Sequence, residues 1–570
     1  MDKLSFMFRL AAVCFILATT PAPASANPLI LKPEGSPRQL QGPIFGGSTT
    51  AFYEHLLDDP AKIATLKTMH IGLDRFSGGS DANFYNWRTG LIEVPTHFNS
   101  SPYVRFWANA AANIARGLPG GVTMEQYQAF SRQIGAEVIM VPNLESSSVA
   151  EQAEWFKHLA AEGAVPQRIE LGNEFWIAMG FDPASMARWP DEPSSMRVMK
   201  QYLDAIRPYL PANAKMAVQA AASEFIVPDN ARGWRAQRLR QWDEDLRPEP
   251  WFDAVTLHLY PRLSEVMGDP RAASTPPAPG NAMARLKAMM AHVDEGVERE
   301  LRDIERRLPG KQIWITEWNA RGGNPVPKRG DIEPASPAMA MLWTTRMAMV
   351  YLRHPSVTAS LYFMFSFRPR DNFATFVSDW RGNYAPVPLA VALAWLNEAA
   401  NAGGSFQRVI QPGARPIAGG GARDESYLPV EGGLFQSRER ATLILENASA
   451  DQFSLDPATL RPGRRPSSVE FMSMPDLADT AKLPARIESR NAGGTITVAP
   501  FSVTRIVWDG RASGGGAAIY RRAAMTTVRL LGSVPADEVL ASLESAIDEV
   551  LDCPHVRARM LGDLRDGERT

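Results

Sequence analysis

Eight short apolar segments recur between residues 43 and 402, and longer helical patterns separate most of them. Stretches such as 122–133, 194–207 and 283–307 place apolar residues three and four positions apart, which is the spacing of amphipathic helices. Apolar strands that alternate with helices are typical of a parallel sheet buried on both faces. Eight such units predict a closed (β/α)8 barrel with insertions. The predicted strands are residues 43–47, 70–76, 137–142, 168–172, 215–220, 254–260, 312–317 and 358–365.

A doubly wound open sheet is the alternative architecture for alternating strands and helices. That fold carries a phosphate-binding glycine motif directly after its first strand. The glycines at 419–421 lie instead in a loop-like stretch that is poor in strand patterns. The barrel over residues 43–402 is therefore the favoured prediction.

From about residue 403 the pattern changes to short segments of alternating polarity, separated by Pro, Gly, Asn and Asp. Such segments predict a small antiparallel β-sandwich over residues 403–510. Residues 27–42 are too few to form a domain of their own, so we expect them to add a strand to this sandwich. The clearest alternating segments are 441–445, 468–472, 495–498 and 502–507.

The first 26 residues have the pattern of a signal peptide. Lys3 and Arg9 precede or flank a short apolar run at 10–17, and Ala24-Ser25-Ala26 is a small-residue cleavage site. We therefore expect export to the periplasm or the extracellular space; the alternative is a buried hydrophobic N-terminal helix. Cleavage after Ala26 would leave Cys553 as the one remaining cysteine, so no intramolecular disulfide is expected. No later run approaches the ~20 apolar residues of a membrane span.

Residues 511–570 are predicted to be a linker followed by a helical tail. The sequence RASGGG at 511–516 is typical of a flexible linker. Beyond it, residues 535–551 place Val539, Leu543 and Ile547 on one face of an amphipathic helix. This helix would either dock on its own chain as an accessory element or contact a protein partner.

Charge and cysteine content exclude several classes of function. The chain has 60 Lys+Arg against 62 Asp+Glu and no block rich in Lys or Arg, so no nucleic-acid partner is expected. Two cysteines cannot form a cysteine-based zinc site. The histidines are scattered and no HExxH pattern occurs. We predict neither a metal site nor a cofactor.

Polar residues gather at the ends of four predicted barrel strands. Reactive side chains of such barrels come from the C-terminal strand ends and from the loops that follow. Four polar strand ends that meet at one mouth therefore predict an active site. The four ends read LDRFSGG at 73–79, IELGNEFW at 169–176, TLHLYP at 256–261 and WITEWN at 314–319.

Two of these ends carry the carboxylates that glycoside hydrolysis requires. Glu174 and Glu317 follow the fourth and the seventh strand, so we expect them to face each other across the mouth. A retaining glycosidase uses a carboxylate nucleophile and a protonated carboxylic acid about 5–5.5 Å apart. Arg75 and Tyr260 are predicted to keep Glu317 ionised. A partly dry pocket and a neighbouring anion are predicted to keep Glu174 protonated.

Each candidate residue has a structural alternative. Glu174 and Glu317 could cap helices at the surface, and Arg75 could pair with Asp74. Glu170 could point into the barrel by strand alternation, and we treat it as a structural carboxylate.

The aromatic and imidazole candidates have alternatives as well. His258 could be a satisfied core histidine. Trp176 and Trp318 could stack on a sugar or pack in the core.

The motifs resemble a known group of enzymes. Asn173-Glu174 at the end of one strand, with Glu317 about three strands later, is similar to the retaining glycoside hydrolases built on TIM barrels. Within that clan, ELGNE at 170–174, VTLHLY at 255–260 and PGKQIWITE at 309–317 are most similar to the heparanase/β-glucuronidase family. A barrel followed by a β-sandwich is also similar, and the resemblance covers roughly residues 28–510 in outline.

The resemblance implies a role for each matching residue. Glu174 would be the acid/base and Glu317 the nucleophile. Asn173 would contact the sugar 2-hydroxyl, Tyr260 would hydrogen-bond the nucleophile, and His258 would line the pocket.

The segment after Glu317 departs from the heparanase pattern. In that family, small hydroxyl residues and a Tyr precede glycines whose N–H groups meet a uronic-acid carboxylate; here Gly322 and Gly323 lie about one residue earlier. The triplet EWN at 317–319 and the sequence RFSGG at 75–79 resemble the α-L-arabinofuranosidase and β-xylosidase families instead. Further along this loop, three cationic residues would attract an acidic sugar or form a solvated surface. They are Arg321, Lys328 and Arg329.

Together these observations predict a secreted retaining glycoside hydrolase that cleaves an oligo- or polysaccharide by double displacement, with a heparanase- or β-glucuronidase-like activity. An α-L-arabinofuranosidase or β-xylosidase is the first alternative. A non-catalytic polysaccharide-binding protein on the same scaffold is the second. An interaction protein that acts through its C-terminal helix is the third.

Overall fold

The computed structural model describes residues 26–509 except 50, 55, 99–100, 118–119, 228–231, 274, 320–334, 368–374, 379–382, 482 and 491–492. The chain divides into two compact units, Met1–Arg511 and Ala512–Thr570, and all described residues belong to the first. The predicted signal peptide up to residue 25, the linker and the helical tail therefore lie outside the described residues.

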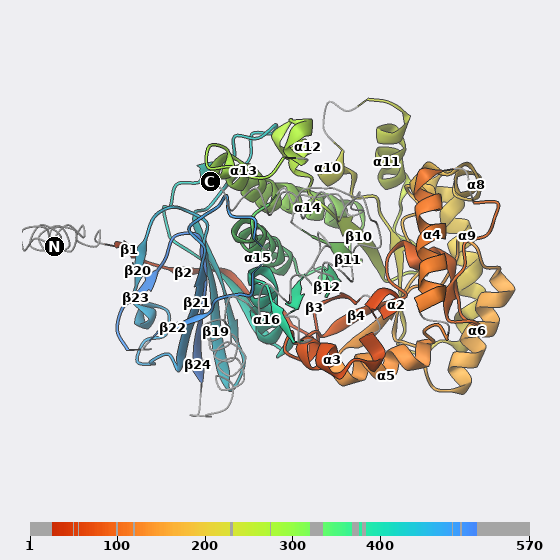
Figure 1. Cartoon of the computed structure of the whole chain (residues 1–570), viewed down its shortest axis with the longest axis horizontal. Coiled ribbons are helices and arrows are strands. Elements are labelled where there is room, and N and C mark those ends of the chain that lie inside the picture. The colour runs from red at the N-terminus through yellow and green to blue at the C-terminus, as the bar shows by residue number, and fades with distance from the viewer. Residues whose placement is uncertain are drawn as a thin grey trace, which may run out of the picture. The chain divides into compact units, whose positions relative to one another are not determined.

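Eight parallel strands close into a barrel in the order β10-β11-β12-β3-β4-β7-β8-β9. This confirms the predicted (β/α)8 fold, and each strand overlaps a segment that the apolar pattern predicts (Figure 1). The strands are β3 (Phe45–Thr49), β4 (Leu73–Phe76), β7 (Glu137–Met140), β8 (Arg168–Glu170), β9 (Lys215–Gln219), β10 (Ala254–Leu259), β11 (Gln312–Trp318) and β12 (Val357–Phe365).

Helices surround the barrel, and several begin at a residue that caps their free N–H groups. Thr123 and Ser148 each form a reciprocal capping box with the residue three positions later, and Ser336 accepts from Met339 N. The helices are α3 (Pro60–Lys67), α5 (Met124–Ile134), α6 (Val149–Ala161), α9 (Glu192–Ile206), α11 (Trp234–Asp245), α13 (Ala282–Ala291), α14 (Val297–Arg307), α15 (Pro337–Arg353) and α16 (Pro388–Asn401). A π-helical turn, η5 (His292–Gly296), joins α13 to α14.

Further elements lie in the connections between the barrel strands. The helical ones are α2 (Ala51–Glu54), η1 (Leu56–Asp58), η2 (Ser80–Phe84), α4 (Pro102–Gly117), α7 (Ala178–Phe181), α8 (Pro183–Arg188), η3 (Arg207–Tyr209), α10 (Ser223–Ile226), α12 (Leu263–Met267) and η4 (Pro270–Ala273). Two small hairpins are formed by β5 (Tyr85–Asn86) with β6 (Leu91–Ile92) and by β13 (Phe376–Ser378) with β14 (Tyr384–Pro386).

The C-terminal part of the described chain is a β-sandwich, as predicted. A seven-stranded sheet has the order β2-β15-β18-β19-β24-β21-β22, and a three-stranded sheet has the order β1-β20-β23. Apolar side chains of both sheets form one cluster between them. The strands are β1 (Asn27–Leu29), β2 (Lys32–Leu40), β15 (Gly404–Ile410), β18 (Val430–Gln436), β19 (Arg440–Asn447), β20 (Phe453–Leu455), β21 (Ser468–Ser473), β22 (Glu488–Arg490), β23 (Ile496–Val498) and β24 (Ser502–Asp509). The remaining elements are the hairpin of β16 (Ile417–Ala418) and β17 (Ser426–Tyr427) and the turn η6 (Pro457–Thr459).

The N-terminal strands belong to this sandwich. β2 pairs antiparallel with β15, and β1 pairs parallel with β20. The chain thus passes through the sandwich before it enters the barrel at β3 and returns to the sandwich after α16.

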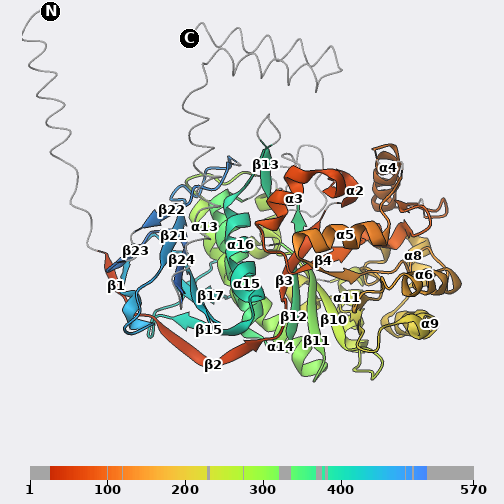
Figure 2. The same ribbon diagram turned by 90° about the horizontal axis from the view of Figure 1, so that it is seen from below.

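Helices α15 and α16 lie between the barrel and the sandwich (Figure 2). Residues 338–352 of α15 are all buried, which explains why this helix is apolar on every side. Arg346 in the middle of α15 is fully buried. Its guanidinium contacts Glu446 of β19 at 2.7 Å and Asp294 of η5 at 3.1 Å, so an ion pair crosses from the helix layer to the sandwich.

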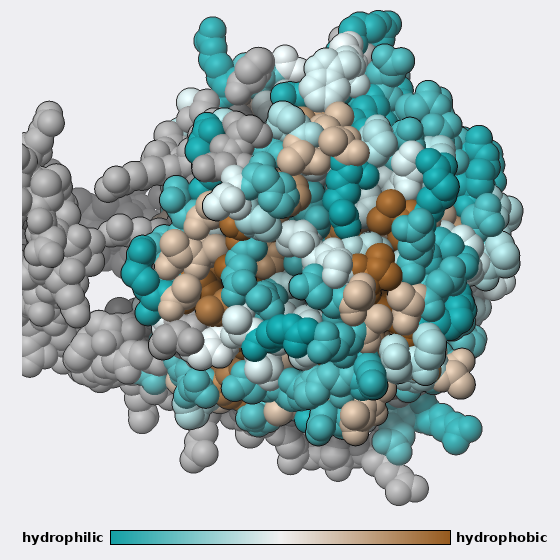
Figure 3. All heavy atoms as spheres, turned by 90° about the vertical axis from the view of Figure 1, so that its right-hand side faces the viewer, coloured by the Kyte–Doolittle hydropathy of each residue, from teal (hydrophilic) through white to brown (hydrophobic). Residues whose placement is uncertain are grey.

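The outer surface is mostly hydrophilic where α4, α6, α8 and α9 face outward, and hydrophobic side chains form small patches within it (Figure 3). Within the described residues, every helix is too short or too polar to span a bilayer.

Candidate active site

The site lies at the C-terminal ends of the barrel strands, above an apolar layer. Seven inward side chains, among them Leu73, Ala254 and Trp314, fill the barrel below it. Successive residues of a strand point to opposite faces. Arg75 lies two positions after Leu73 on the same strand, so its side chain also points inward. At this level of the barrel the inward side chains are polar rather than apolar.

A β-bulge in β11 brings two neighbouring residues to the same side. Against β12, the register advances from Ile315 paired with Ser360 to Trp318 paired with Tyr362, so three steps of β11 oppose two of β12. A register shift also occurs against β10, where His258 pairs with Glu317. A bulge re-aims side chains in this way. As a result, Thr316 and Glu317 both contact residues of the site.

Arg75 is the central cation of the site and is fully buried. Its Nε and Nη2 donate to the two oxygens of Glu170 at 2.8 Å each, a bidentate pair. Nη1 donates to Glu317 Oε1 at 2.5 Å, and Nη2 also donates to Asn173 Oδ1 at 2.9 Å. Burial raises the pKa of Glu170, but the charge of Arg75 outweighs it and holds that pKa below its usual value. Glu170 is therefore an ionised partner that fixes Arg75.

Glu317 is held from two sides. Arg75 contacts Oε1, and the Tyr260 hydroxyl donates to Oε2 at 2.7 Å. The side chain of Glu317 is 6% exposed, so a ligand can reach the carboxylate but little water surrounds it. An added Cβ on Gly79 would lie 3.1 Å from Glu317 Oε1, so a glycine at this position keeps the space beside the carboxylate free.

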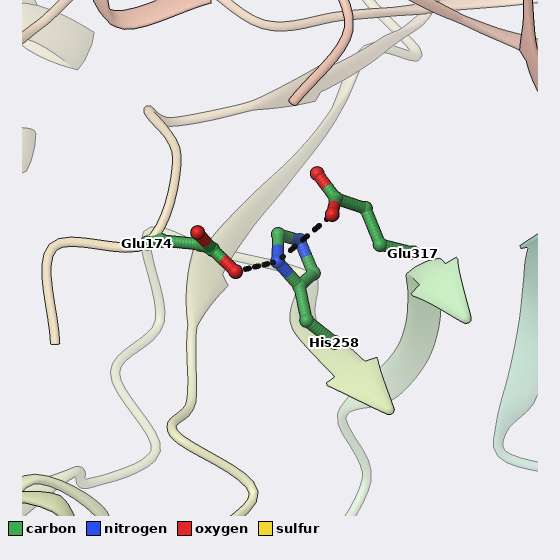
Figure 4. A group of neighbouring side chains, drawn as sticks. All are labelled: Glu174, His258 and Glu317. Atoms are coloured by element: carbon green, nitrogen blue, oxygen red, sulfur yellow. Dashed lines mark hydrogen bonds and ion pairs between the residues drawn. The ribbon is translucent and has the colours of Figure 1, made fainter. Parts of the chain in front are cut away.

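Glu174 lies across the mouth from Glu317, with the ring of His258 between them (Figure 4). His258 Nδ1 lies 2.9 Å from Glu174 Oε1 and 3.7 Å from Glu317 Oε2. One oxygen of each carboxyl and one ring nitrogen all lie within 4.8 Å of one another. Glu174 is the most open of the group, with 14% of its side chain exposed.

His258 is a buried cation. Burial alone lowers its pKa, but the negative charge of Glu317 and the contacts with Glu170 and Glu174 raise the pKa of His258 to about 10. At neutral pH both ring nitrogens therefore carry protons. Nδ1–H donates to Glu174 and Nε2–H to Thr316 Oγ1 at 3.2 Å, while the Thr316 hydroxyl donates to Glu170 at 3.1 Å.

This raised pKa predicts that stability falls at alkaline pH. An unfolded histidine titrates near pH 6.5, so between that pH and about 10 the folded protein holds one proton more at His258 than the unfolded chain does. The stabilisation from His258 is complete below pH 6.5 and is lost as pH rises through about 10. We expect His258→Asn to flatten the decline of the free energy of unfolding between pH 7 and 10, measured by urea denaturation.

The exposed His158, which pairs with Glu125 at the surface, is the control position. His158→Asn should leave the decline as steep as in the parent protein. Equal slopes for the parent and His258→Asn would contradict a protonated His258.

The loop after β8 has an unusual backbone. Glu174 itself has a φ of 54°, and Ala178, Met179 and Phe181 have φ values of 43°, 47° and 64°. Ala178, Met179, Gly180 and Phe181 form a left-handed turn. A left-handed backbone costs about 1–2 kcal/mol for each residue other than glycine. Strain of this kind is concentrated at functional sites.

Several polar contacts hold that turn in place. Ser101 N donates to the buried Asp182 carboxylate at 3.1 Å, just beyond the turn. Asn83 Nδ2 donates to Asn173 O at 3.0 Å and contacts Met179 Sδ at 3.0 Å. The loop that carries Glu174 is thereby fixed to the segment after β4.

The structure brings most of the predicted site residues together but not all of them. Glu174, Glu317, Arg75, Asn173, His258 and Tyr260 form one connected group.

The two predicted tryptophans lie in the packed layers instead. Trp318 is fully buried and packs edge-on against Tyr351 of α15 and Tyr362 of β12, outside the barrel wall. Trp176 is 7% exposed and belongs to the main apolar core. Gly322 and Gly323, with Arg321, Lys328 and Arg329, lie outside the described residues.

Several site residues were not predicted. Thr316 links His258 to Glu170, and its place in the alternation of β11 could have suggested an inward side chain. Phe363 at the end of β12 lies 6.0 Å from Tyr260, ring to ring, and beside Gly79. Tyr103 of α4 donates to or accepts from Ser80 Oγ at 2.7 Å. It lies in an insertion, where no periodicity points to the site.

The spacing of Glu174, His258 and Glu317 could in principle suit a metal ion. Both ring nitrogens of His258 already have partners, Glu174 Oε1 at 2.9 Å and Thr316 Oγ1 at 3.2 Å. Both oxygens of Glu317 already accept hydrogen bonds from Arg75 and Tyr260. The donor set therefore fits proton transfer and charge stabilisation better than metal binding.

Comparison with known proteins finds the same fold in solved structures but no match by sequence. No protein-family model and no curated protein sequence matches the chain. Solved structures do match, and among them are arabinofuranosidases and a xyloglucanase.

The structural matches cover almost the full length of the solved proteins. A family 51 arabinofuranosidase from Xanthomonas axonopodis pv. citri is 16% identical with a TM-score of 0.55, over 84% of this chain and 98% of that one. A family 51 α-L-arabinofuranosidase from Bifidobacterium longum is 11% identical with a TM-score of 0.58, over 85% and 100%. A family 44 xyloglucanase from Paenibacillus polymyxa is 12% identical with a TM-score of 0.50, over 84% and 98%. At these identities the similarity shows a shared fold, as the sequence resemblance to TIM-barrel glycoside hydrolases implies.

Proposed function

We propose that the protein is a glycoside hydrolase that cleaves with retention of configuration, with Glu317 as nucleophile and Glu174 as acid/base. The observation that carries the proposal is the pairing of these two carboxyls across the barrel mouth, with oxygens no more than 4.8 Å apart. A retaining enzyme holds its carboxyls about 5–5.5 Å apart, whereas an inverting one leaves about 6.5–9.5 Å for a water molecule.

The surroundings of the two carboxyls support different roles. Glu317 accepts from Arg75 and Tyr260, which stabilise its charge and leave it in place to attack an anomeric carbon. Glu174 is the more exposed of the two, so it can exchange a proton with water between the two half-reactions.

The charge of the cluster supports the same assignment. Glu170, Glu174 and Glu317 carry three negative charges when ionised, against the two positive charges of Arg75 and His258. The carboxylates therefore exceed the cations by one charge, and the proposed reaction needs one carboxyl, Glu174, to act as the acid.

In the proposed reaction, Glu317 attacks the anomeric carbon and Glu174 protonates the leaving oxygen. A water molecule deprotonated by Glu174 then releases the sugar from Glu317. Asn173 Oδ1 accepts from Arg75, while its buried Nδ2 has no partner among the described residues. That N–H group is available for the sugar 2-hydroxyl.

Two sugars are the leading candidates for the cleaved unit. The similarity of the fold to two arabinofuranosidases and the RFSGG and EWN motifs favour an α-L-arabinofuranoside. The motifs at 170–174, 255–260 and 309–317 favour a β-D-glucuronide. Export of the enzyme, which the first 26 residues predict, would place it with polysaccharides outside the cytoplasm.

The test is hydrolysis of 4-nitrophenyl α-L-arabinofuranoside, β-D-xyloside, β-D-galactoside and β-D-glucuronide, with the first-formed anomer followed by NMR. We expect cleavage of at least one glycoside and release of the sugar with its original anomeric configuration. Release of the opposite anomer would exclude the double displacement. A folded protein that cleaves neither these glycosides nor oligosaccharides of the same sugars would exclude the proposed function.

A further inference from the structure

Three aromatic side chains lie at the rim of the site beyond Glu174: Tyr103, Phe181 and Trp234, named here the aromatic rim. Tyr103 belongs to α4, which follows β4. Phe181 ends α7, which follows β8, and Trp234 begins α11, which follows β9. Segments that follow the C-terminal ends of barrel strands all start at the same mouth. The three rings therefore share the side of the barrel on which the carboxyls lie.

The aromatic rim is continuous with the catalytic loop. An added Cβ on Gly180 would lie 2.7 Å from Tyr103 Cβ, so the ring of Tyr103 packs directly on the left-handed turn next to Phe181. The Tyr103 hydroxyl lies 2.7 Å from Ser80 Oγ, and Ser80 follows Gly79, which lies beside Glu317 Oε1. Burial, and then the charge of Glu174, raise the pKa of Tyr103. Tyr103 is thus the member of the rim nearest to the reacting bond.

Phe181 and Trp234 form the outer part of the rim. Their ring centroids lie 5.0 Å apart at an interplanar angle of 80°. The guanidinium of Arg235 lies 4.6 Å from the centroid of Phe181 and 5.3 Å from that of Trp234. Trp234 is 54% exposed, which is unusual for a large apolar ring.

Helix α11 is tied to the loop that carries Glu174, so Trp234 is not independent of the site. Arg238, one turn after Trp234, donates to the carbonyls of Phe175 and Trp176 at 3.0 and 2.9 Å. These two residues directly follow Glu174. The same helix therefore presents an open ring to solvent and fixes the backbone of the acid/base.

We propose that the aromatic rim binds sugar units on the leaving-group side of the cleaved bond, so that the substrate is an oligo- or polysaccharide rather than a simple glycoside. The inference rests on the proposed function, because the acid/base protonates the leaving oxygen and the leaving sugar must therefore lie on the Glu174 side. From there a glycan chain would meet Tyr103 first and then the exposed part of the Trp234 ring. Aromatic faces suit the apolar C–H face of a sugar ring, and exposed rings beside a catalytic cleft are a typical means of holding one.

The experiment compares two substrates of the same sugar in the parent and in Trp234→Ala. One is the 4-nitrophenyl glycoside that the parent cleaves, whose leaving group is a single small ring. The other is the matching oligosaccharide: arabinotriose, xylotriose, galactotriose or a hyaluronan tetrasaccharide. We expect Trp234→Ala to lower kcat/KM for the oligosaccharide by about tenfold, with less than about twofold change for the nitrophenyl glycoside.

Two further variants serve as controls. Trp234→Phe keeps an apolar face and should recover most of the oligosaccharide activity. Leu483→Ala removes a comparably exposed apolar side chain, 59% exposed, outside the barrel and should change neither substrate. Trp234 is exposed, so its removal should leave the fold intact.

The outcomes separate this inference from the proposed function. Equal losses on both substrates, or no loss on either, would overturn the aromatic rim as a sugar site while leaving the hydrolase assignment in place. A change of oligomeric state in Trp234→Ala with unchanged kinetics would identify the rim as a contact between copies of the chain and overturn the inference. A parent protein inactive on both substrates would overturn the proposed function and the inference with it.

Discussion

Replacement of Glu317 by glutamine should lower kcat for glycoside hydrolysis by about 10⁴-fold or more, because an amide cannot form the glycosyl-enzyme bond. Glutamine has nearly the same shape and keeps a carbonyl oxygen for Arg75 and a polar neighbour for Tyr260, so the protein should fold. The measurement is kcat on the best aryl glycoside, with circular dichroism and thermal unfolding as folding checks.

A smaller side chain adds a positive readout. In Glu317→Ala, azide can enter the vacated space and attack the anomeric carbon directly. The product should be a glycosyl azide of inverted configuration, whereas azide acting in a Glu174→Ala enzyme should give the retained one. This pair of products assigns the two carboxyls to their roles independently of rates.

The matched control is Glu425→Gln. Glu425 is also a buried carboxylate, paired with His292 at 3.0 Å and Arg299 at 2.9 Å, but it lies outside the site. The variant should lose stability because it weakens these pairs, yet its kcat should remain within about threefold of the parent value. A Glu317→Gln enzyme as active as Glu425→Gln would rule out Glu317 as the nucleophile.

Replacement of Arg75 by methionine should destabilise the fold by about 3–5 kcal/mol, because it leaves Glu170 and Glu317 buried without their shared cation. Hydrolysis should also be lost, since Glu317 would keep only its hydrogen bond from Tyr260 and Asn173 would lose its contact with Arg75. The free energy of unfolding is measured by urea denaturation at pH 7.

The pH dependence of this variant has a definite sign. In the parent, Arg75 holds the pKa of Glu170 below its usual value, so this pair contributes stability above about pH 4.5 that is lost as pH falls. In Arg75→Met, protonation relieves the unpaired charge, and the deficit relative to the parent should shrink between pH 7 and pH 5.

Two comparisons separate charge from packing. Arg75→Met combined with Glu170→Gln removes the unpaired negative charge of Glu170. The double variant should regain part of the lost stability without regaining activity. Arg168→Met is the control, because Arg168 is also on a barrel strand but donates to the carbonyl of Thr358 at 3.1 Å. A loss for Arg75→Met no larger than that for Arg168→Met would contradict the central role of Arg75.

The barrel could be predicted because each of its strands is buried on both faces and therefore appears as an apolar run. The strand ends were accurate to within a few residues, as for β11 at Gln312–Trp318 against the predicted 312–317. Arg75 and His258 could be placed at the mouth because they lie at the C-terminal ends of predicted barrel strands.

The details of the site could not be predicted in the same way. The bulge at Thr316–Glu317 is a change in backbone register, and strict alternation would place one of these two side chains outside the barrel. Trp318 adjoins Glu317 in sequence, but the pleat directs its ring into the helix layer.

Two other features depend on tertiary contacts rather than on local sequence. The left-handed turn at Ala178–Phe181 contains residues that favour a right-handed backbone, and contacts from Ser101 and Asn83 override that preference. The position of His258 between the carboxyls follows from the closure of the barrel, which no single segment encodes.

The burial of α15 on every side has a consequence for truncation of this protein. A truncation after the barrel would leave a 17-residue apolar helix facing water and would strip Arg346 of Glu446. The C-terminal sheets are thus not an independent domain that could be exchanged between enzymes. Barrel and sheets are expected to unfold together in one cooperative step, because both pack on the same layer of two helices, α15 and α16.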